Sequence, residues 1–264
     1  MEFQKLPIIK KLQELATPPK QLYYLGNYKP ELFKNAVAVV GSRRLTEYGK
    51  RVIEKIVPQL VFNKQTIISG FMYGTDQFAH QTCLDNGGVT VAVLGWGIDK
   101  KLTGYDKKLF DQIIDNGGLI VSEWETQEGT NWTFPVRDRI IAALADEIIV
   151  TEAAVKSGAL ITVRDAVKLK RKIWAVPGPI TSKTSEGTNN LIFSKQAEMW
   201  LGQTSQQALT FDNPVLALLQ NESLSTDEIA RKLNRSVSDL GSELSILLLS
   251  GKIVERSGKY YLGE

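Results

Sequence analysis

Short apolar runs recur between residues 36 and 200, and Gly/Ser turns and stretches with helical periodicity separate them. The runs span residues 37–40, 66–68, 89–94, 119–121, 147–150 and 172–176. They are apolar throughout, which is typical of strands buried on both faces of a parallel sheet. The intervening stretches, such as 49–62, 76–84 and 159–169, have the length and spacing of helices. This alternation predicts a doubly wound α/β domain with a mostly parallel sheet and right-handed crossovers.

The two ends of the chain differ from this pattern. Residues 1–35 are interrupted by prolines and predict a short segment, with a helix at 6–15 and an extended piece at 22–25. The α/β domain then occupies residues 36–205, and the polar stretch 202–207 indicates a linker.

Residues 212–264 predict a second, smaller domain. Three short helices are expected at 213–220, 226–233 and 237–250, followed by a hairpin of residues 252–256 and 259–262 that turns at Ser257-Gly258. Ser225 and Glu228 have the spacing of a capping box at the start of the second helix, and Ser236 with Asp239 gives a weaker version for the third. Three helices followed by a hairpin is the order of a winged-helix domain.

Composition excludes several classes of protein. With 264 residues, 43% of them hydrophobic, the chain can bury a core without disulfides or metals. A single cysteine (Cys83) and a single histidine (His80) allow neither an internal disulfide nor a Cys/His zinc site, and we expect no metal or cofactor. No apolar run reaches the ~18 residues of a membrane helix. The N-terminus also lacks the apolar core of a signal peptide, so we expect a cytoplasmic protein that does not bind membranes.

The charge of the chain is unevenly distributed. Residues 212–264 hold six Lys/Arg and eight Asp/Glu, so they carry −2, and the remainder carries +5 of the total +3. A polyanionic partner is therefore expected on the α/β domain rather than on the tail.

The loops that follow the predicted strands carry small and polar residues suited to an anion. Ligands of doubly wound sheets bind beyond the carboxyl ends of the strands. There the sequence places Gly41-Ser42-Arg43, the loop beginning Ser69-Gly70, and Ser157-Gly158 at the start of a helix. Small residues let a backbone approach closely, helix N-termini offer free N–H groups, and arginine grips a phosphate with two donors. A phosphate site is the favoured interpretation, although glycine also follows strands for purely structural reasons.

A second cluster, Phe134 with Arg137 and Arg139, lies where a helix is expected to begin. Arginine at a helix N-terminus opposes the helix dipole, so a phosphate or a carboxylate should neutralise these two side chains. Structural ion pairs with Asp138, Glu123 or Asp146 are an equally good explanation.

Enzymatic chemistry has weak support in the sequence. Neither a Gly-x-Gly-x-x-Gly fingerprint nor a P-loop is present. His80 follows Asp76 by four residues, on one helix face, but no nucleophile accompanies them. We favour a structural histidine bonded to Asp76 or to backbone. Cys83, in an apolar helix, is expected in the core.

Taken together, these motifs resemble the DNA-processing protein A (DprA/Smf) family. The resemblance runs in order from about residue 18 to 200. It rests on Val39-Val40-Gly41-Ser42-Arg43, Ser69-Gly70 with Gly74-Thr75-Asp76 and Ala79-His80, Val93-Leu94-Gly95, Phe134-Pro135 with Arg137 and Arg139, Ser157-Gly158-Ala159-Leu160-Ile161-Thr162, and Ala175-Val176-Pro177-Gly178. Where the family usually has Arg and Asn, this chain has Tyr73 and Asp138, which makes the predicted site less positive.

The resemblance implies an extended Rossmann-like domain followed by a small winged-helix domain. It also implies a bacterial protein that forms a homodimer, binds and protects single-stranded DNA, and loads the RecA recombinase during natural transformation, without enzymatic turnover. On this interpretation the strand's phosphates and bases contact Gly41, Ser42, Arg43, Gly70, Phe134, Arg137, Arg139, Ser157 and Gly158.

Two other interpretations remain open at this point. The same loops would suit a nucleotide-binding or nucleoside-monophosphate-cleaving enzyme of a related Rossmann-like fold, with Glu152 as the candidate acid, although the Pro-Gly-Gly-x-Gly-Thr motif of such enzymes is missing. Alternatively the winged helix reads the DNA through a local patch of Arg231, Lys232 and Arg235, against which the tail's negative charge argues.

Overall fold

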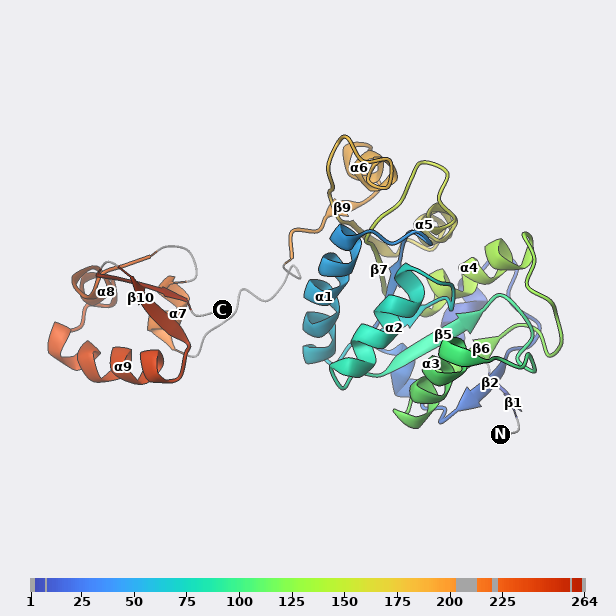
Figure 1. Ribbon diagram of the computed structural model, residues 1–264, viewed down its shortest axis with the longest axis horizontal. Coiled ribbons are helices and arrows are strands. Elements are labelled where there is room, and N and C mark those ends of the chain that lie inside the picture. The colour runs from blue at the N-terminus through green and yellow to red at the C-terminus, as the bar shows by residue number, and fades with distance from the viewer. Residues whose placement is uncertain (1–2, 8, 203–212, 220–222, 257, 263–264) are drawn as a thin grey trace. The chain divides into compact units, whose positions relative to one another are not determined.

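The protein forms two compact units, residues 1–202 and 203–264, in a computed structural model (Figure 1). The structure describes residues 3–7, 9–202, 213–219, 223–256 and 258–262. The predicted linker at 202–207 lies, apart from Gly202, outside these residues, and so does Ser257 of the predicted hairpin turn.

A nine-stranded sheet forms the centre of the first unit, in the order β1-β2-β6-β5-β4-β3-β7-β8-β9. The six predicted strands are confirmed and run parallel: β3 (Ala36–Val40), β4 (Thr66–Ser69), β5 (Thr90–Leu94), β6 (Leu119–Ser122), β7 (Glu147–Val150) and β8 (Lys172–Ala175). The strand order reverses at β3, whose two neighbours are β4 and β7. Ligand sites of doubly wound sheets lie at such a reversal.

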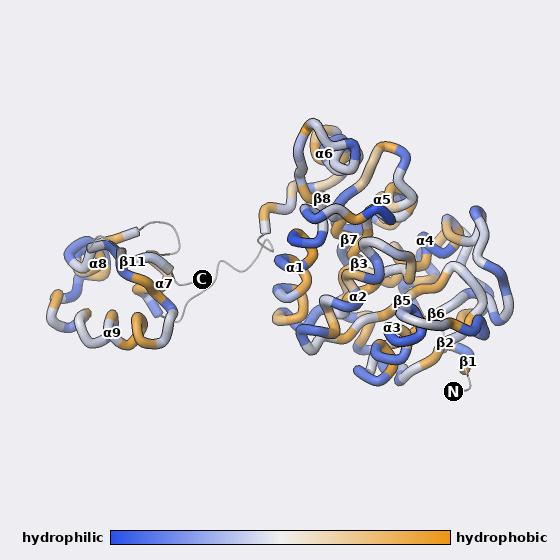
Figure 2. The backbone as a smooth tube through the Cα atoms, viewed as in Figure 1, coloured by the Kyte–Doolittle hydropathy of each residue, from blue (hydrophilic) through white to orange (hydrophobic). Residues whose placement is uncertain are grey.

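Strand β3 lies at the centre of the sheet, and neither of its faces reaches water, which suits its unbroken run of apolar residues. Ala36, Ala38 and Val40 pack against helices α4 (Thr133–Leu144) and α5 (Ala159–Lys168). Val37 and Val39 pack on the opposite face against α1 (Glu47–Phe62) and α2 (Thr75–Asp85). Helices thus cover both faces of the sheet, and the apolar strands lie between them (Figures 1 and 2).

The N-terminal segment extends this sheet. Strand β2 (Tyr23–Gly26) pairs antiparallel with β6, and β1 (Gln4–Lys5) pairs antiparallel with β2. The helix expected over 6–15 is only a short 3-10 helix, η1 (Lys10–Glu14), and Leu6 N instead donates to Leu22 O at 2.7 Å. A second 3-10 helix, η2 (Pro30–Phe33), leads into β3.

The remaining elements of the first unit are helix α3 (Gly104–Asp115), helix α6 (Glu186–Phe193) and strand β9 (Glu198–Met199), which pairs parallel with β8. No helix within the described residues is long and apolar enough to cross a bilayer.

The second unit has the predicted order of elements. Helices α7 (Pro214–Leu219), α8 (Thr226–Leu233) and α9 (Val237–Leu249) precede an antiparallel pair, β10 (Ile253–Arg256) and β11 (Lys259–Leu262). The capping box is formed, since Ser225 N donates to Glu228 Oε2 at 2.7 Å and Glu228 N donates to Ser225 Oγ at 3.4 Å. Ile229, Leu240 and Leu244 belong to a core of this unit's own residues.

Candidate nucleic-acid interface

The loops that follow strands β3, β4 and β7 converge at the carboxyl edge of the sheet, as predicted. Thr75 N donates to Ser42 O at 3.1 Å, which joins the loop after β4 to the loop after β3. Gly74 has φ +87°, and a Cβ there would lie 2.5 Å from Ser42 O. A Cβ on Gly41 would lie 2.6 Å from the hydroxyl oxygens of both Thr75 and Thr151. Glycine is therefore required at both positions for the loops to meet.

A small cavity of about 40 Å³ lies where these loops meet α4 and α5. Four of the predicted site residues line it, namely Gly41, Arg43, Arg137 and Gly158. Ser42 lies beside the cavity and shapes the turn, because its Oγ accepts from Arg44 N at 3.0 Å. The structure thus brings these loops, which are distant in the sequence, together at one cavity.

Arg43 is exposed, and its guanidinium lies over the ring of Phe134, with Cζ 5.1 Å from the ring centroid. Phe134 is held in turn by Trp96, whose ring meets it edge-on at 6.2 Å. Gly95 allows this packing, since a Cβ there would lie 2.5 Å from Phe134 Cδ1. The result is a cation stacked on an aromatic ring at the rim of the cavity.

Arg137 forms the floor of the cavity and is only 3% exposed. Its Nε donates to Asp138 Oδ1 at 3.0 Å, and its Nη1 donates to the carbonyl of Val93. Gly70 lies behind this group, because a Cβ on it would meet both the Asp76 carboxylate and the Arg137 guanidinium. Arg137 therefore forms the structural ion pair, with Asp138. Because its side chain is buried, its charge acts on a ligand in the cavity only from beneath.

Two carboxyl groups face this single arginine. Burial raises the pKa of Asp76 to about 6, against the opposing effect of Arg137. Burial also raises the pKa of Asp138, again opposed by Arg137. With both groups ionised, the floor carries one positive and two negative charges. Asp138 thus adds a negative charge beneath the cavity.

Arg139 lies apart from the cavity, contrary to expectation. Its Nη2 donates to both carboxylate oxygens of Glu123, at 2.7 and 2.9 Å. Residues 137 and 139 point to different sides of α4 because they are two positions apart and a helix turns by about 200° over two residues. The alternative given for this arginine, an ion pair with Glu123, is what the structure contains.

At the N-terminus of α5, Gly158 is exposed, and a Cβ on it would meet no atom within 4 Å. Its backbone is helical, with φ −58° and ψ −32°. Ser157 Oγ accepts from Ala159 N at 3.4 Å. This end of the helix therefore presents backbone to the cavity without a side chain in the way.

The residues that invited catalytic interpretations have structural partners. His80 is fully buried; its Nε2 donates to Gly70 O at 2.5 Å, and burial lowers its pKa to about 4. Of the two partners expected for it, backbone is correct and Asp76 is not. Cys83 is buried in the core, as predicted.

Glu152, the candidate acid, is 1% exposed and accepts from Thr46 N at 3.1 Å and Thr184 Oγ1 at 3.3 Å. Sequence reasoning missed that it anchors the loop after β3, because no spacing signal links residues 46 and 152. Among the described residues, no three His, Cys, Asp or Glu side chains are grouped to hold a metal ion.

The predicted patch on the second unit is partly neutralised. Arg235 Nη1 donates to Glu243 Oε2 at 2.6 Å, and Arg231 Nε donates to the carbonyl of Asp227 at 3.3 Å. Arg235 is thus paired with a carboxylate of its own unit.

Comparison with known proteins agrees with this architecture. A family model described as DNA recombination-mediator protein A matches residues 4–211, and one described as the DprA winged helix domain matches residues 206–259. The chain is 38% identical over 200 residues to DNA processing protein DprA of Streptococcus pneumoniae, which covers 72% of this chain and 70% of the relative. It is 31% identical over 278 residues to protein Smf of Escherichia coli, covering 92% and 74% of the two chains.

Solved structures show the same fold. DprA from Streptococcus pneumoniae superimposes with a TM-score of 0.68 at 36% identity, over 75% of this chain and 71% of that one. DNA processing protein A from Helicobacter pylori, described for its single-stranded DNA binding mode, gives a TM-score of 0.67 at 30% identity, over 75% and 90%. Two domain models in the right order, two relatives above 30% identity and the motifs around the cavity lead to one conclusion: this chain belongs to the DprA/Smf family of DNA processing proteins.

Proposed function

We propose that this protein binds single-stranded DNA at the carboxyl edge of its sheet. The observation that carries the proposal is the Arg43–Phe134 pair at the rim of a cavity formed by strand-end loops. Arginine and an aromatic ring are the two groups that sequence-tolerant single-strand binding needs, one for phosphate and one for a base. The Helicobacter pylori relative, described for its single-stranded DNA binding mode, supports the same ligand.

The roles of the site residues follow from their exposure. Arg43 holds one phosphate, and the backbone of Gly41, Ser42, Ser157 and Gly158 lines its approach. Phe134, over whose ring the Arg43 guanidinium lies, supplies the aromatic surface for a base. Gly70 and Arg137 support the site from beneath, and Arg139, engaged with Glu123, is not part of the proposed surface.

Fluorescence anisotropy with a labelled oligothymidine tests this proposal. Arg43→Ala should weaken binding at least tenfold, because an exposed bidentate phosphate contact is lost while no buried group is disturbed. It should also reduce the slope of log K against log salt by about 0.7, the value for one phosphate of a single strand. Lys108→Ala, an exposed lysine on α3, is the control and should change neither quantity. Equal affinity of Arg43→Ala and the unaltered protein would refute the site.

We further propose that the protein acts as a homodimer, since one cavity covers little of a strand. The outer edge of β9 has no paired strand among the described residues. Large apolar side chains stand exposed near it, with Phe193 at 89% and Met199 at 46%. Exposed apolar side chains beside an open sheet edge are typical of a surface that a second copy covers.

Mass photometry of Phe193→Glu tests the dimer. A carboxylate in an apolar interface should shift the population to monomers. Phe62→Glu is a matched control, because Phe62 is 82% exposed at the end of α1, away from β9. Dimers that survive Phe193→Glu would exclude this face.

The role that we propose in the cell is delivery of the bound strand to RecA during natural transformation. It rests on family membership, and its test is RecA-catalysed strand exchange on DNA precoated with single-strand-binding protein. The unaltered protein should accelerate the reaction and Arg43→Ala should not. Acceleration by both would separate RecA loading from this DNA site.

A further inference from the structure

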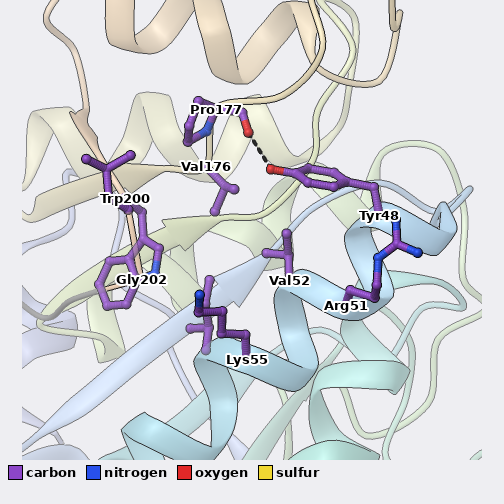
Figure 3. Close-up of a pocket in the computed structure, with 10 residues that line it drawn as sticks. Tyr48, Arg51, Val52, Lys55, Val176, Pro177, Trp200 and Gly202 are labelled. Atoms are coloured by element: carbon purple, nitrogen blue, oxygen red, sulfur yellow. Dashed lines mark hydrogen bonds between the residues drawn. The ribbon is translucent and has the colours of Figure 1, made fainter. Parts of the chain in front are cut away.

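A groove of about 330 Å³ lies between helix α1 and the C-terminal end of the first unit, away from the residues of the proposed DNA site (Figure 3). Apolar side chains line its walls, and Tyr48 closes one end by donating its hydroxyl to Pro177 O at 2.6 Å. The apolar lining comprises Val52, Ile56, Val176, Pro177, Trp200 and Leu201. A groove of this size takes one large side chain together with its backbone.

Two cations stand at the rim of this groove. Arg51 and Lys55 both line it and both are exposed, one helical turn apart on α1. Within the part of the chain that the structure describes, neither makes an ion pair. The nearby Glu47 is engaged by Lys50 at 2.6 Å, and the charge of Arg51 also helps to lower the pKa of this carboxyl. The rim is therefore positive, over walls that are apolar.

A buried donor in the groove wall lacks a partner. Trp200 is 3% exposed and packs edge-on against Trp174 at 5.4 Å. Its indole N–H has no hydrogen-bond acceptor within the described structure. The Lys55 side chain reaches the chain just after this ring, since a Cβ on Gly202 would lie 3.2 Å from Lys55 Cε. A buried N–H without an acceptor is unfavourable, so an acceptor supplied by a ligand would be favourable there.

We infer that this groove binds an acidic segment of a partner protein, with one large apolar side chain against Val52 and Val176 and flanking carboxylates on Arg51 and Lys55. A carbonyl or carboxylate oxygen of the segment accepts from the Trp200 N–H. The largely aliphatic walls favour a peptide over a nucleic acid, whose bases need exposed ring faces. The inference is independent of the proposed DNA site, which uses other loops.

Anisotropy of fluorescein-labelled peptides on the full chain tests the groove. The probes contain four aspartates around one phenylalanine, leucine or tryptophan, and the two controls replace the aspartates by serine or the apolar residue by glycine. We expect saturable binding of at least one acidic probe and at least tenfold weaker binding of both controls. Lys55→Glu should weaken the bound probe at least tenfold. Lys50→Glu makes the same charge change on the same helix outside the groove, and it should stay within twofold. Trp200→Phe, which keeps a ring and removes the donor, should weaken binding of the probe about fivefold.

The other outcomes overturn the inference. Absence of binding by all three acidic probes at ~1 mM, where even weak transient contacts are detectable, excludes an acidic peptide. If Lys50→Glu weakens binding of the acidic probe as much as Lys55→Glu does, the effect comes from the net charge of the protein and not from the groove. Dissociation of a dimer by Lys55→Glu assigns the groove to a second copy. Loss of oligothymidine binding by Lys55→Glu assigns it to the DNA path, whereas unchanged oligothymidine binding keeps the two sites distinct.

Discussion

The guanidinium carbon of Arg43 lies 5.1 Å from the centroid of the Phe134 ring. These residues come from the loop after β3 and the first turn of α4, so the sheet and the helices together create the pair. A strand bound here meets both groups at once. Their contributions to DNA binding should therefore depend on each other.

A double-mutant cycle measures this dependence. Phe134→Ala should weaken oligothymidine binding about tenfold or more, since one base–aromatic stack is worth about 1–3 kcal/mol. Combined with Arg43→Ala, the loss should be smaller than the sum of the two single losses, because the ring also positions the guanidinium. Strictly additive losses in a binding titration would show that the two groups act separately.

Gly158→Ala separates binding from stability. The position has helical φ and ψ and free space around it. Alanine should therefore leave the free energy of unfolding unchanged or raise it by about 0.4–1 kcal/mol, and the melting temperature should not fall. The added methyl group projects where a phosphate would approach the backbone, and oligothymidine affinity should fall. Calorimetry measures the stability and anisotropy measures the oligothymidine affinity, on the same sample. Unchanged affinity would remove the α5 N-terminus from the DNA site.

Gly74→Ala should destabilise the protein more than Gly87→Ala. Both glycines have positive φ, +87° and +72°. An added Cβ at residue 74 would meet the carbonyl oxygens of Ser42 and Arg43, whereas at residue 87 it would meet nothing within 4 Å. We expect Gly87→Ala to lose about 1–2 kcal/mol of unfolding free energy, from the backbone conformation alone. Gly74→Ala should lose at least ~2 kcal/mol more, because of the clash. Equal midpoints in urea unfolding would contradict this reason for Gly74.

DNA binding should strengthen as pH falls from 7.5 to 5.5 at constant ionic strength. Asp76, with its pKa raised to about 6, becomes protonated in this window, which removes a negative charge beneath the cavity. His80, the single histidine, has its pKa lowered to about 4 and stays neutral. A group whose pKa is raised on folding binds more protons in the folded state, so Asp76 also makes stability fall as pH rises from about 4 to 6.

Asp138→Asn should raise oligothymidine affinity at pH 7.5 about two- to fivefold, since one screened charge near a phosphate is worth about 0.5–1 kcal/mol. Asparagine keeps the oxygen that accepts from Arg137 Nε, so folding should be preserved. Anisotropy at pH 7.5 measures the gain, and Asp76→Asn should abolish the pH dependence. A weaker Asp138→Asn protein with an unaltered melting temperature would show that this carboxylate assists binding.

The pattern of the chain by itself determined the strands and their order of appearance. Residues 147–150 were expected as a buried strand and form β7, because an unbroken apolar run is stable only between two layers of helices. The winged-helix unit could be predicted for the same kind of reason, since caps such as Ser225 with Glu228 act within one turn. The grouping of Gly41, Arg43 and Gly158 also followed, because strand order sends their loops to one edge of the sheet.

Only the tertiary structure decided where each arginine points. Arg137 and Arg139 are two residues apart in one motif, yet one is bonded to the carbonyl of Val93 and the other to Glu123, across 44 and 16 residues of sequence. Such contacts depend on how α4 packs on the sheet, and no local spacing encodes that packing. The same holds for the groove of Trp200, whose walls come from residues 48–56 and 176–202. Periodicity and turns are local properties, whereas a binding surface is made by segments that meet only after folding.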